Sequence, residues 1–420
     1  MTKTFASFVA RGALIVGLFG ATTVLVERDA HACGGCFAPP GPGTQVTAHR
    51  MAFAVSPRRT ILWDQFQYTG SPKEFGWVLP IRGKVDVGVS SDQLFQRLDN
   101  ATAVQVVGPP TPSCPRLNRG FASAASDEAA GASFDAGVNV WDQKTVGPYE
   151  ATQLSATDGN ALRTWLRDHG YVLPAAVESV IDDYIKEGFG FIVIKLVPDA
   201  DVTRMVPIRI AFDGANPMLP LRMIAAGTGA KVGLQLYVLG EGRWETKNFP
   251  TAEIKTDDLV WDYAAMGSNY NQVFIDTLAK NAGRTWVSES SDDVGRDTLF
   301  SGLPGGTTVD DAGSTVFAKD TDTTDIDRAF PGRTNLVVTR LFAELPQSAL
   351  GQDLELQASL AGKLPRVRTV TNTKNHPCPG SDSSSVFGCA SAGSGSSTFT
   401  WLGLAFAGAV AASVARRRRA

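Results

Sequence analysis

The sequence is short of the residues and motifs that most catalytic centres use. It contains four histidines and five cysteines in 420 residues, and no two histidines stand in the H-E-x-x-H or H-x-H spacing of a metallohydrolase. It also lacks the G-x-S-x-G nucleophile motif, the G-K-[ST] end of a phosphate loop and a G-x-G-x-x-G after a strand. No sequence motif therefore points to an enzyme, although a catalytic triad assembled in space would leave no such trace.

The chain also lacks an excess of charge. Charged residues make up 19% and hydrophobic residues 43% of the chain, so the middle can bury a core, and neither a disordered nor a polytopic membrane protein fits. Without residues 1–32 and the last arginines, the body carries 32 bases against 40 acids, a net charge of −8. A mildly acidic body has no electrostatic reason to bind nucleic acid, so no nucleic-acid partner is expected.

The N-terminus predicts a cleavable signal peptide over residues 1–32. A basic start precedes the uncharged apolar stretch 12–26, whose 15 residues are short for a membrane-spanning helix. Small residues then stand at the positions that signal peptidase accepts, ending at Ala32. Cleavage there would leave Cys33 first, and it is favoured over lipidation of Cys33 because a lipoprotein signal prefers a small residue where His31 stands.

The C-terminus predicts a membrane anchor in three parts. Residues 373–398 form a Ser/Gly-rich tether, 399–415 an uncharged apolar transmembrane helix, and 416–420 a basic cytoplasmic tail. The order of Cys389, linker, short apolar helix and arginine cluster resembles the C-terminal sorting signals of myxobacterial surface proteins. That resemblance implies that a sorting protease processes and anchors the chain at Cys389. The membrane is thus an expected partner, and the body is expected to lie outside the cytoplasm.

The cysteines favour structural disulfides. If Cys389 is used for anchoring, the four that remain in an oxidising compartment are Cys33, Cys36, Cys114 and Cys378. Cys33 and Cys36 form a C-x-x-C, but no strand precedes it and two glycines disfavour a helix after it, unlike a thioredoxin-type motif. A Zn²⁺ site built with the other two cysteines and redox chemistry at the C-x-x-C remain as alternatives.

The hydrophobic pattern predicts an α+β fold, mostly antiparallel strands with a helical hairpin and a few further helices. We expect an N-terminal β-rich region over 33–120, a loop insertion over 121–137 and a main α+β region over 138–372. The hairpin comprises helices over 158–169, with Thr157 as N-cap, and over 174–187. Other expected elements are a helix at 91–98, a helix at 272–282, a loop at 299–327, and an antiparallel meander of strands at 189–197, 205–212, 219–225 and 232–239.

Two features in the body have candidate chemistry. Asp320, Asp322, Asp325 and Asp327 lie close enough in sequence to hold Ca²⁺ through carboxylate oxygens, but the EF-hand pattern fails and a solvated loop is favoured. Lys195 stands inside an apolar strand, where a depressed pKa would make it a base or a Schiff-base former. Pairing with an acid or reaching solvent is favoured for it. No cofactor is expected, with Ca²⁺ or Zn²⁺ as the alternatives.

Several segments together resemble one bacterial family, known only as domain of unknown function 2330. The stretches that carry the resemblance are Ala32-Cys33-Gly34-Gly35-Cys36-Phe37, Phe75-Gly76-Trp77-Val78-Leu79-Pro80, the helix core with Trp165-Leu166-Arg167, Gly190-Phe191-Ile192-Val193-Ile194-Lys195-Leu196, and Thr339-Arg340-Leu341-Phe342-Ala343-Glu344-Leu345. The resemblance covers roughly residues 32–372. It implies a shared fold and an exported location, and it brings no activity, ligand or catalytic residue.

The sequence therefore favours an exported, membrane- or surface-anchored protein that acts as a binding or structural module. The alternative is an extracytoplasmic thiol- or metal-dependent enzyme that uses Cys33 and Cys36.

Overall fold

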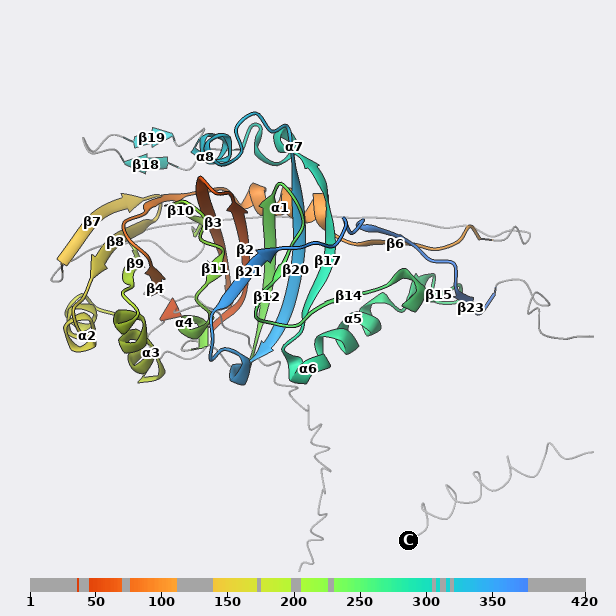
Figure 1. The fold of residues 1–420 in the computed structure, drawn as a ribbon, viewed down its shortest axis with the longest axis horizontal. Helices are drawn as coiled ribbons and strands as arrows, with labels where there is room; N and C mark the ends of the chain where they lie inside the picture. The colour runs from red at the N-terminus through yellow and green to blue at the C-terminus, as the bar shows by residue number, and fades with distance from the viewer. Residues whose placement is uncertain are drawn as a thin grey trace, which may run out of the picture. The chain divides into compact units, whose positions relative to one another are not determined.

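The computed structural model describes most of the body of the chain (Figure 1). The described residues are 36–37, 45–69, 76–111, 139–171, 175–197, 205–225, 230–303, 307–309, 315–317 and 321–376. One compact unit ends at Asn375, and of the second unit, 376–420, only His376 is described. The expected signal peptide, loop insertion, transmembrane helix and basic tail lie outside the described residues. No helix among the described residues is long and apolar enough to cross a membrane.

The larger of two main sheets has eight strands. All neighbours in it are antiparallel except two pairs, β12 with β2 and β14 with β17. In spatial order the strands are β14 (Thr251–Glu253), β17 (Trp286–Gly295), β20 (Asn335–Pro346), β12 (Lys231–Gly240), β2 (Gln45–Val55), β3 (Arg59–Thr69), β10 (Ile208–Asp213) and β5 (Asp86–Val89).

The second main sheet has seven strands and is antiparallel throughout. Its spatial order is β1 (Cys36–Phe37), β4 (Gly76–Ile81), β9 (Gly190–Leu196), β8 (Tyr149–Ser155), β7 (Asn139–Val146), β18 (Thr307–Val309) and β19 (Thr315–Phe317).

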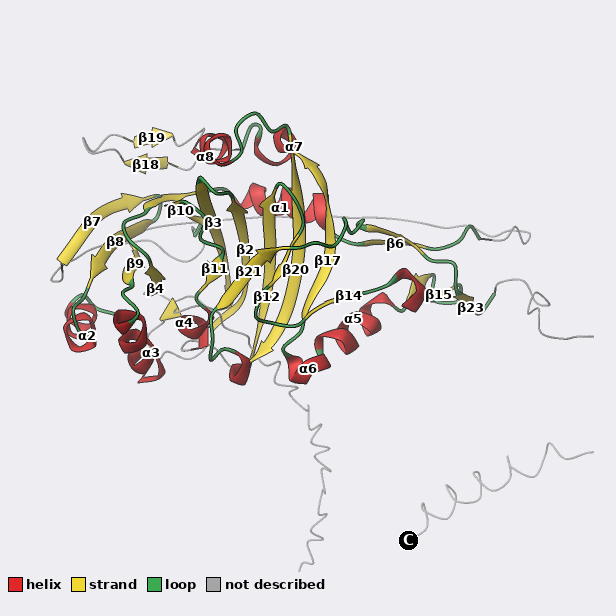
Figure 2. Cartoon of the chain, viewed as in Figure 1, coloured by secondary structure: helices red, strands yellow, loops and turns green. Residues whose placement is uncertain are grey.

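The two sheets pack face to face, and helices cover the outer face of each, so the body has four layers (Figure 2). In β2, Met51 and Phe53 face the second sheet, while Ala52 and Ala54 face the helices. The helices over the eight-stranded sheet are α1 (Asp92–Thr102), α7 (Arg296–Phe300) and α8 (Thr321–Ala329), and those over the seven-stranded sheet are α2 (Gly159–Asp168) and α3 (Ala175–Lys186). Because both faces of each sheet are buried, the central strands have apolar residues on both sides.

The helical hairpin is confirmed, with one correction to its start. Helices α2 and α3 pack together and bury Leu162, Trp165 and Ile181 against the seven-stranded sheet. The N-cap is Asp158 and not Thr157, because the Asp158 carboxylate accepts hydrogen bonds from two backbone N–H groups of the first turn. Helix α2 ends at Asp168, and Gly170 follows it with a φ of +84°, a conformation that glycine adopts without strain.

The predicted meander is wrong. Strand β9 lies in the seven-stranded sheet, whereas β10 lies in the eight-stranded sheet, so the chain changes sheet between them. The segment predicted as a strand at 219–225 is mostly helix α4 (Leu221–Ala225), which follows a two-residue strand, β11 (Met218–Leu219). Strand β12 then inserts between β20 and β2 rather than beside β10. Strands with two buried faces carry no pattern that identifies their neighbours.

Two further predictions need correction. The helix predicted at 272–282 divides into α5 (Tyr270–Leu278) and α6 (Lys280–Gly283), and within α6 Asn281 and Ala282 have positive φ, so regular helix does not extend to 282. The segment 299–327, predicted as a loop, contains the end of α7 and most of α8.

The remaining described strands, in small sheets, are β6 (Gln105–Val107), β13 (Trp244–Thr246), β15 (Trp261–Asp262), β16 (Gly267–Ser268), β21 (Leu354–Ala358), β22 (Val367–Thr369) and β23 (Thr373–Lys374).

Candidate functional site

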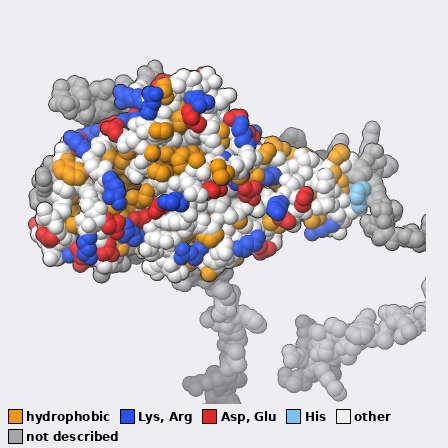
Figure 3. Space-filling view, in the orientation of Figure 1, with side chains coloured by type: hydrophobic (Ala, Val, Ile, Leu, Met, Phe, Trp, Pro, Cys, Tyr) orange, Lys and Arg blue, Asp and Glu red, His pale blue; other side chains and the backbone are white. Residues whose placement is uncertain are grey.

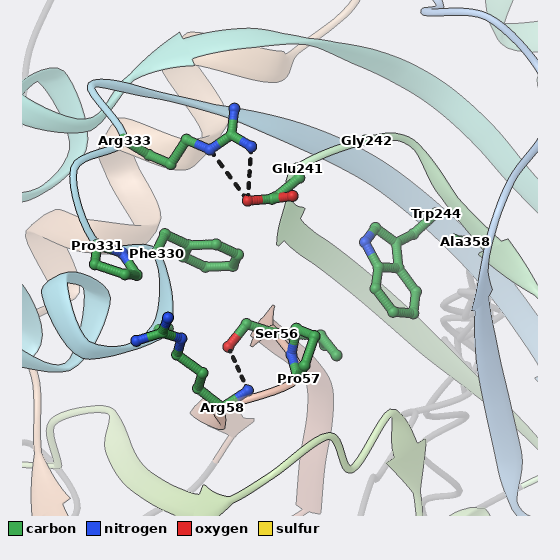
Figure 4. Close-up of a pocket in the computed structure, with 12 residues that line it drawn as sticks. Ser56, Pro57, Arg58, Glu241, Gly242, Trp244, Phe330, Pro331, Arg333 and Ala358 are labelled. Carbon is green, nitrogen blue, oxygen red and sulfur yellow. Dashed lines mark hydrogen bonds and ion pairs between the residues drawn. The ribbon is translucent and has the colours of Figure 1, made fainter.

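A cleft of about 540 Å³ opens where three turns from distant parts of the chain meet (Figure 4). The turns are those between β2 and β3, between β12 and β13, and between α8 and β20. Pockets of roughly 300–1,000 Å³ are typical of small-molecule sites. The lining residues are Val55, Ser56, Pro57, Arg58, Glu241, Gly242, Trp244, Ala329, Phe330, Pro331, Arg333 and Ala358.

The first turn is held rigidly by Ser56. Its hydroxyl accepts hydrogen bonds from the backbone N–H groups of Arg58 and Arg59, at 3.2 and 3.1 Å, and donates to the Arg59 carbonyl at 3.0 Å. Pro57 fixes its own φ within the same turn. These bonds hold the backbone of Arg58 at the floor of the cleft.

The wall opposite Trp244 is built by the end of α8. The Phe330 backbone N–H donates to the Ile326 carbonyl, and its ring is buried against the eight-stranded sheet. Pro331 stops the helix, and Gly332, with a φ of +73°, turns the chain so that Arg333 reaches the rim. The position of this wall therefore depends on how α8 packs against the eight-stranded sheet.

The cleft combines flat apolar surfaces with charge. The half-buried indole of Trp244 faces the Phe330 wall across the cleft. At the rim, Arg333 and Glu241 form an ion pair, with Nη2 of Arg333 2.8 Å from Oε1 of Glu241. Sequence reasoning missed this site because its parts are three short turns, and only the turn at Ser56-Pro57 carried a recognisable signal.

A group of charged side chains holds α8 on the eight-stranded sheet, and it includes two of the predicted aspartates, Asp325 and Asp322. Asp325 is 1% exposed and accepts a hydrogen bond of 2.6 Å from Nε of Arg209, which is itself 2% exposed. Nε of Arg59 lies 2.8 Å from the other Asp325 oxygen. Burial opposes the charge of Arg209, but the carboxylates of Asp325 and Asp86 outweigh that cost and raise its pKa. Asp325 is therefore a structural partner of two arginines.

Asp322, also in α8, is a partly buried carboxylate that faces the eight-stranded sheet. It accepts a hydrogen bond of 2.8 Å from Nε1 of Trp63 and one of 2.5 Å from Oγ of Ser90. Burial raises the pKa of Asp322, the neighbouring Asp325 adds to the rise, and the two hydrogen-bond donors oppose it.

These contacts do not assemble the predicted calcium ligands. Asp327 is exposed and forms an ion pair with Arg296, and Asp320 lies outside the described residues. Across the described ranges, no three His, Cys, Asp or Glu side chains are grouped as a metal site would require. The segment predicted as a solvated loop is a helix because Arg59 and Arg209, from neighbouring strands, compensate one of its carboxylates.

A second, much smaller cavity contains a buried histidine–carboxylate pair. Nδ1 of His49 lies 2.8 Å from Oδ1 of Asp64, and both residues are almost fully buried between the two sheets. Trp77 lines the same cavity, and it is the residue in register with Cys36 across the β1–β4 pair. The other cysteines, Cys33, Cys114, Cys378 and Cys389, and the cleavage residue Ala32 lie outside the described residues.

Lys195 and His169 have structural contacts. Nζ of Lys195 lies 3.5 Å from Oε2 of the buried Glu150, so the predicted pairing with an acid is present. His169 follows the last turn of α2, where it stacks on Trp165 with ring centroids 4.1 Å apart. On the face seen in Figure 3, basic and acidic side chains are intermixed without a field of one sign.

Comparisons with known proteins identify a family but no activity. A family model described as an uncharacterized protein conserved in bacteria (DUF2330) matches residues 28–330. No curated protein matches. Among solved structures, baculovirus P35 aligns at 11% identity and a TM-score of 0.30, covering 76% of this chain and 98% of its own. A mutated baculovirus P35 after caspase cleavage aligns at 9% identity and a TM-score of 0.26, covering 74% of this chain and 98% of its own. Such low scores support no conclusion about fold or activity.

The partly buried carboxylate of Asp322 predicts a pH dependence of stability. Its raised folded-state pKa means that folding favours the protonated form, so its contribution to stability is full below the unfolded value of about 3.9 and is lost as the pH rises through the folded pKa. In urea unfolding, we expect the stability of Asp322→Asn relative to the unmodified chain to improve as the pH rises above about 4, and to level off once the pH exceeds the raised folded-state pKa of Asp322.

Asp262 is the matched control with the opposite sign. A hydrogen bond from Asn375, aided by two backbone N–H groups and Lys374, lowers the pKa of Asp262 to about 2. Its contribution is present above the unfolded value and is lost as the pH falls. Asp262→Asn should therefore be most destabilising at neutral pH, and equal slopes for the two variants would contradict the assignment of the buried charges.

Proposed function

The chain belongs to the bacterial family described as an uncharacterized protein conserved in bacteria (DUF2330), and from this premise we propose that it is an exported, C-terminally anchored protein that binds a small ligand. The observation that carries the binding role is the cleft between the three turns, with a volume suited to a small molecule and with both apolar and charged walls.

The sequence at the two ends supports the proposed location. The apolar stretch before Ala32 is too short to span a bilayer and ends in a peptidase-type site, whereas the stretch 399–415 has 17 uncharged residues ahead of four arginines. A body displayed in this way on the Ser/Gly-rich tether 373–398 would present its cleft to molecules outside the cytoplasm.

The construction of the cleft supports binding in preference to a purely structural role. Each wall is fixed by its own contacts, namely the Ser56 hydroxyl at the floor, the seating of α8 behind Phe330 and the packing of Trp244 on Gly240. A preformed site loses little conformational entropy when a ligand binds. The rim ion pair between Arg333 and Glu241 adds fixed charge next to the apolar walls.

The location predicts how the chain fractionates in its own cells. Protease added to intact or outer-membrane-permeabilised cells should digest the body, and mature protein should start at Cys33 and sediment with membranes. A chain that ends at residue 398 should be released in soluble form, because the apolar helix is then missing. Full-length protein that retains Met1 and stays in the cytosolic fraction would contradict the proposed export.

The binding role predicts a single class of hits in a small-molecule screen of the purified full chain. Ligand-observed NMR with a library of one- to three-ring compounds should find ligands that compete with each other. Trp244→Ala should weaken them by roughly tenfold or more, because it removes the largest flat contact surface. Trp141→Ala, which changes another half-buried tryptophan packed on the core, should leave binding unchanged. Hits with equal affinity for both variants would place the site elsewhere.

A second candidate function is thiol- or metal-dependent chemistry at Cys33 and Cys36. The observation that favours it is the register of Cys36 opposite Trp77, which lines the cavity that contains His49 and Asp64. A histidine–carboxylate pair would stabilise the thiolate form of a cysteine side chain that reached it.

This second candidate predicts two rapidly reacting thiols, or one bound Zn²⁺, in the unreduced full chain. His49→Gln should slow alkylation and shift its pH profile, because the partner that stabilises the thiolate is lost. His169→Gln, a histidine on the far side of the seven-stranded sheet, serves as the control. Complete, inert disulfide pairing without metal would eliminate this candidate.

A further inference from the structure

Two adjacent arginines in the β2–β3 turn have very different surroundings. Arg59 lies within ion-pair distance of three carboxylates, those of Asp325, Asp213 and Asp86. Arg58 is exposed at the cleft, and its hydrogen bond to Ser56 uses only its backbone N–H. Among the residues that the structure describes, no carboxylate pairs with the Arg58 guanidinium.

The charges in the cleft therefore leave one positive charge uncompensated. Glu241 is paired with Arg333, through contacts of 3.0 and 2.8 Å from two guanidinium nitrogens to the same carboxylate oxygen. That pair is neutral as a unit, so Arg58 supplies the net charge of the site. A single guanidinium complements a monoanion, and its planar fork matches a carboxylate in two parallel hydrogen bonds.

The apolar walls of the cleft are flat. The Trp244 indole packs directly on the backbone of Gly240, where a Cβ would collide with its Nε1. Across the cleft lie Pro331 and the almost fully buried Phe330, with Arg58 beside them and Pro57 at the floor (Figure 4). Rings stack on such surfaces with a face-on or offset geometry.

We propose that the cleft binds a ring that carries one carboxylate, with the carboxylate paired to Arg58 and the ring packed on Trp244. This inference rests on the proposed binding function and specifies its ligand class. Two sources offer this chemistry, namely a uronic acid residue of an extracellular polysaccharide and a small aromatic acid. The volume of about 540 Å³ accommodates either as one to three rings.

The test compares matched acids and neutral derivatives by isothermal titration calorimetry on the purified full chain. The probes are galacturonic acid against its methyl ester, and 2-naphthoate against 2-naphthamide. We expect at least one acid to bind about 10- to 100-fold more tightly than its neutral counterpart, because only the acid makes a charged hydrogen bond. The acid that shows this preference identifies the source.

The variants then assign the preference to a residue. Arg58→Met should reduce the affinity of the acid to that of the neutral derivative, and because Arg58 is exposed this change leaves the packing intact. Arg167→Met removes the same charge from the exposed surface of α2 and should leave the preference unchanged. Trp244→Phe should weaken acid and neutral probes alike.

The outcomes separate this inference from the function on which it rests. If neither acid is preferred, or if the preference survives in Arg58→Met, the ligand class is wrong. In that event, screening hits that still depend on Trp244 would keep the binding function. If no ring compound of the screen binds the chain at all, the binding function itself is wrong.

Discussion

The ion pair between Arg209 and Asp325 fixes α8 on the eight-stranded sheet, and one wall of the cleft depends on that placement of α8. Both groups are almost fully buried, and charges in such surroundings are costly unless they are paired and hydrogen-bonded. Removing one partner from a buried pair typically costs roughly 3–5 kcal/mol, because the other charge is left uncompensated. The observed placement of α8 pairs Asp325 with the two arginines and also brings Asp322 to Trp63 and Ser90. That placement puts Phe330 and Arg333 at the cleft.

Packing and electrostatics act on the same helix in different ways. The apolar contacts of Ile326, Ala329 and Phe330 with the sheet supply attraction without direction, since hydrophobic burial is insensitive to small sliding movements. The carboxylate contacts are directional and select the register of the helix on the sheet. Apolar burial thus holds α8 against the sheet, and the carboxylate contacts determine its register. The position of the cleft wall depends on that register.

The sequence predicted the α+β class and the helical hairpin because these depend on local patterns. Leu162, Trp165 and Ile181 repeat at helical spacing, and glycines mark the ends of both helices. The sheet topology could not be predicted, because β9 and β10 are buried on both faces and β12 alternates only over its first half, so no pattern identifies their neighbours. The aspartate-rich segment was misjudged for a related reason. Its compensating charges, Arg59 and Arg209, lie far away in the sequence, so nothing nearby distinguished a buried helix from a solvated loop.

The cleft could not be predicted for a geometric reason. Arg58, Glu241 and Phe330 come from three connections whose proximity exists only after both sheets have formed. Taken alone, each of these three connections has the sequence of an ordinary turn. The family description names no activity, so the proposed ligand class rests on the chemistry of the cleft walls alone.

The parallel pairing of β2 with β12 has a consequence for how the chain reaches this structure. The β2–β3 hairpin can form from neighbouring residues, but the other side of β2 is completed only when Leu234 comes opposite His49, and β12 is itself paired along its length with β20, near the end of the body. Until then β2 presents unpaired N–H and C=O groups at an open edge. Contacts between such distant segments slow folding, and an open strand edge promotes association with other chains in the meantime. The early hairpin is therefore open to association with other chains along β2 until β12 pairs with it.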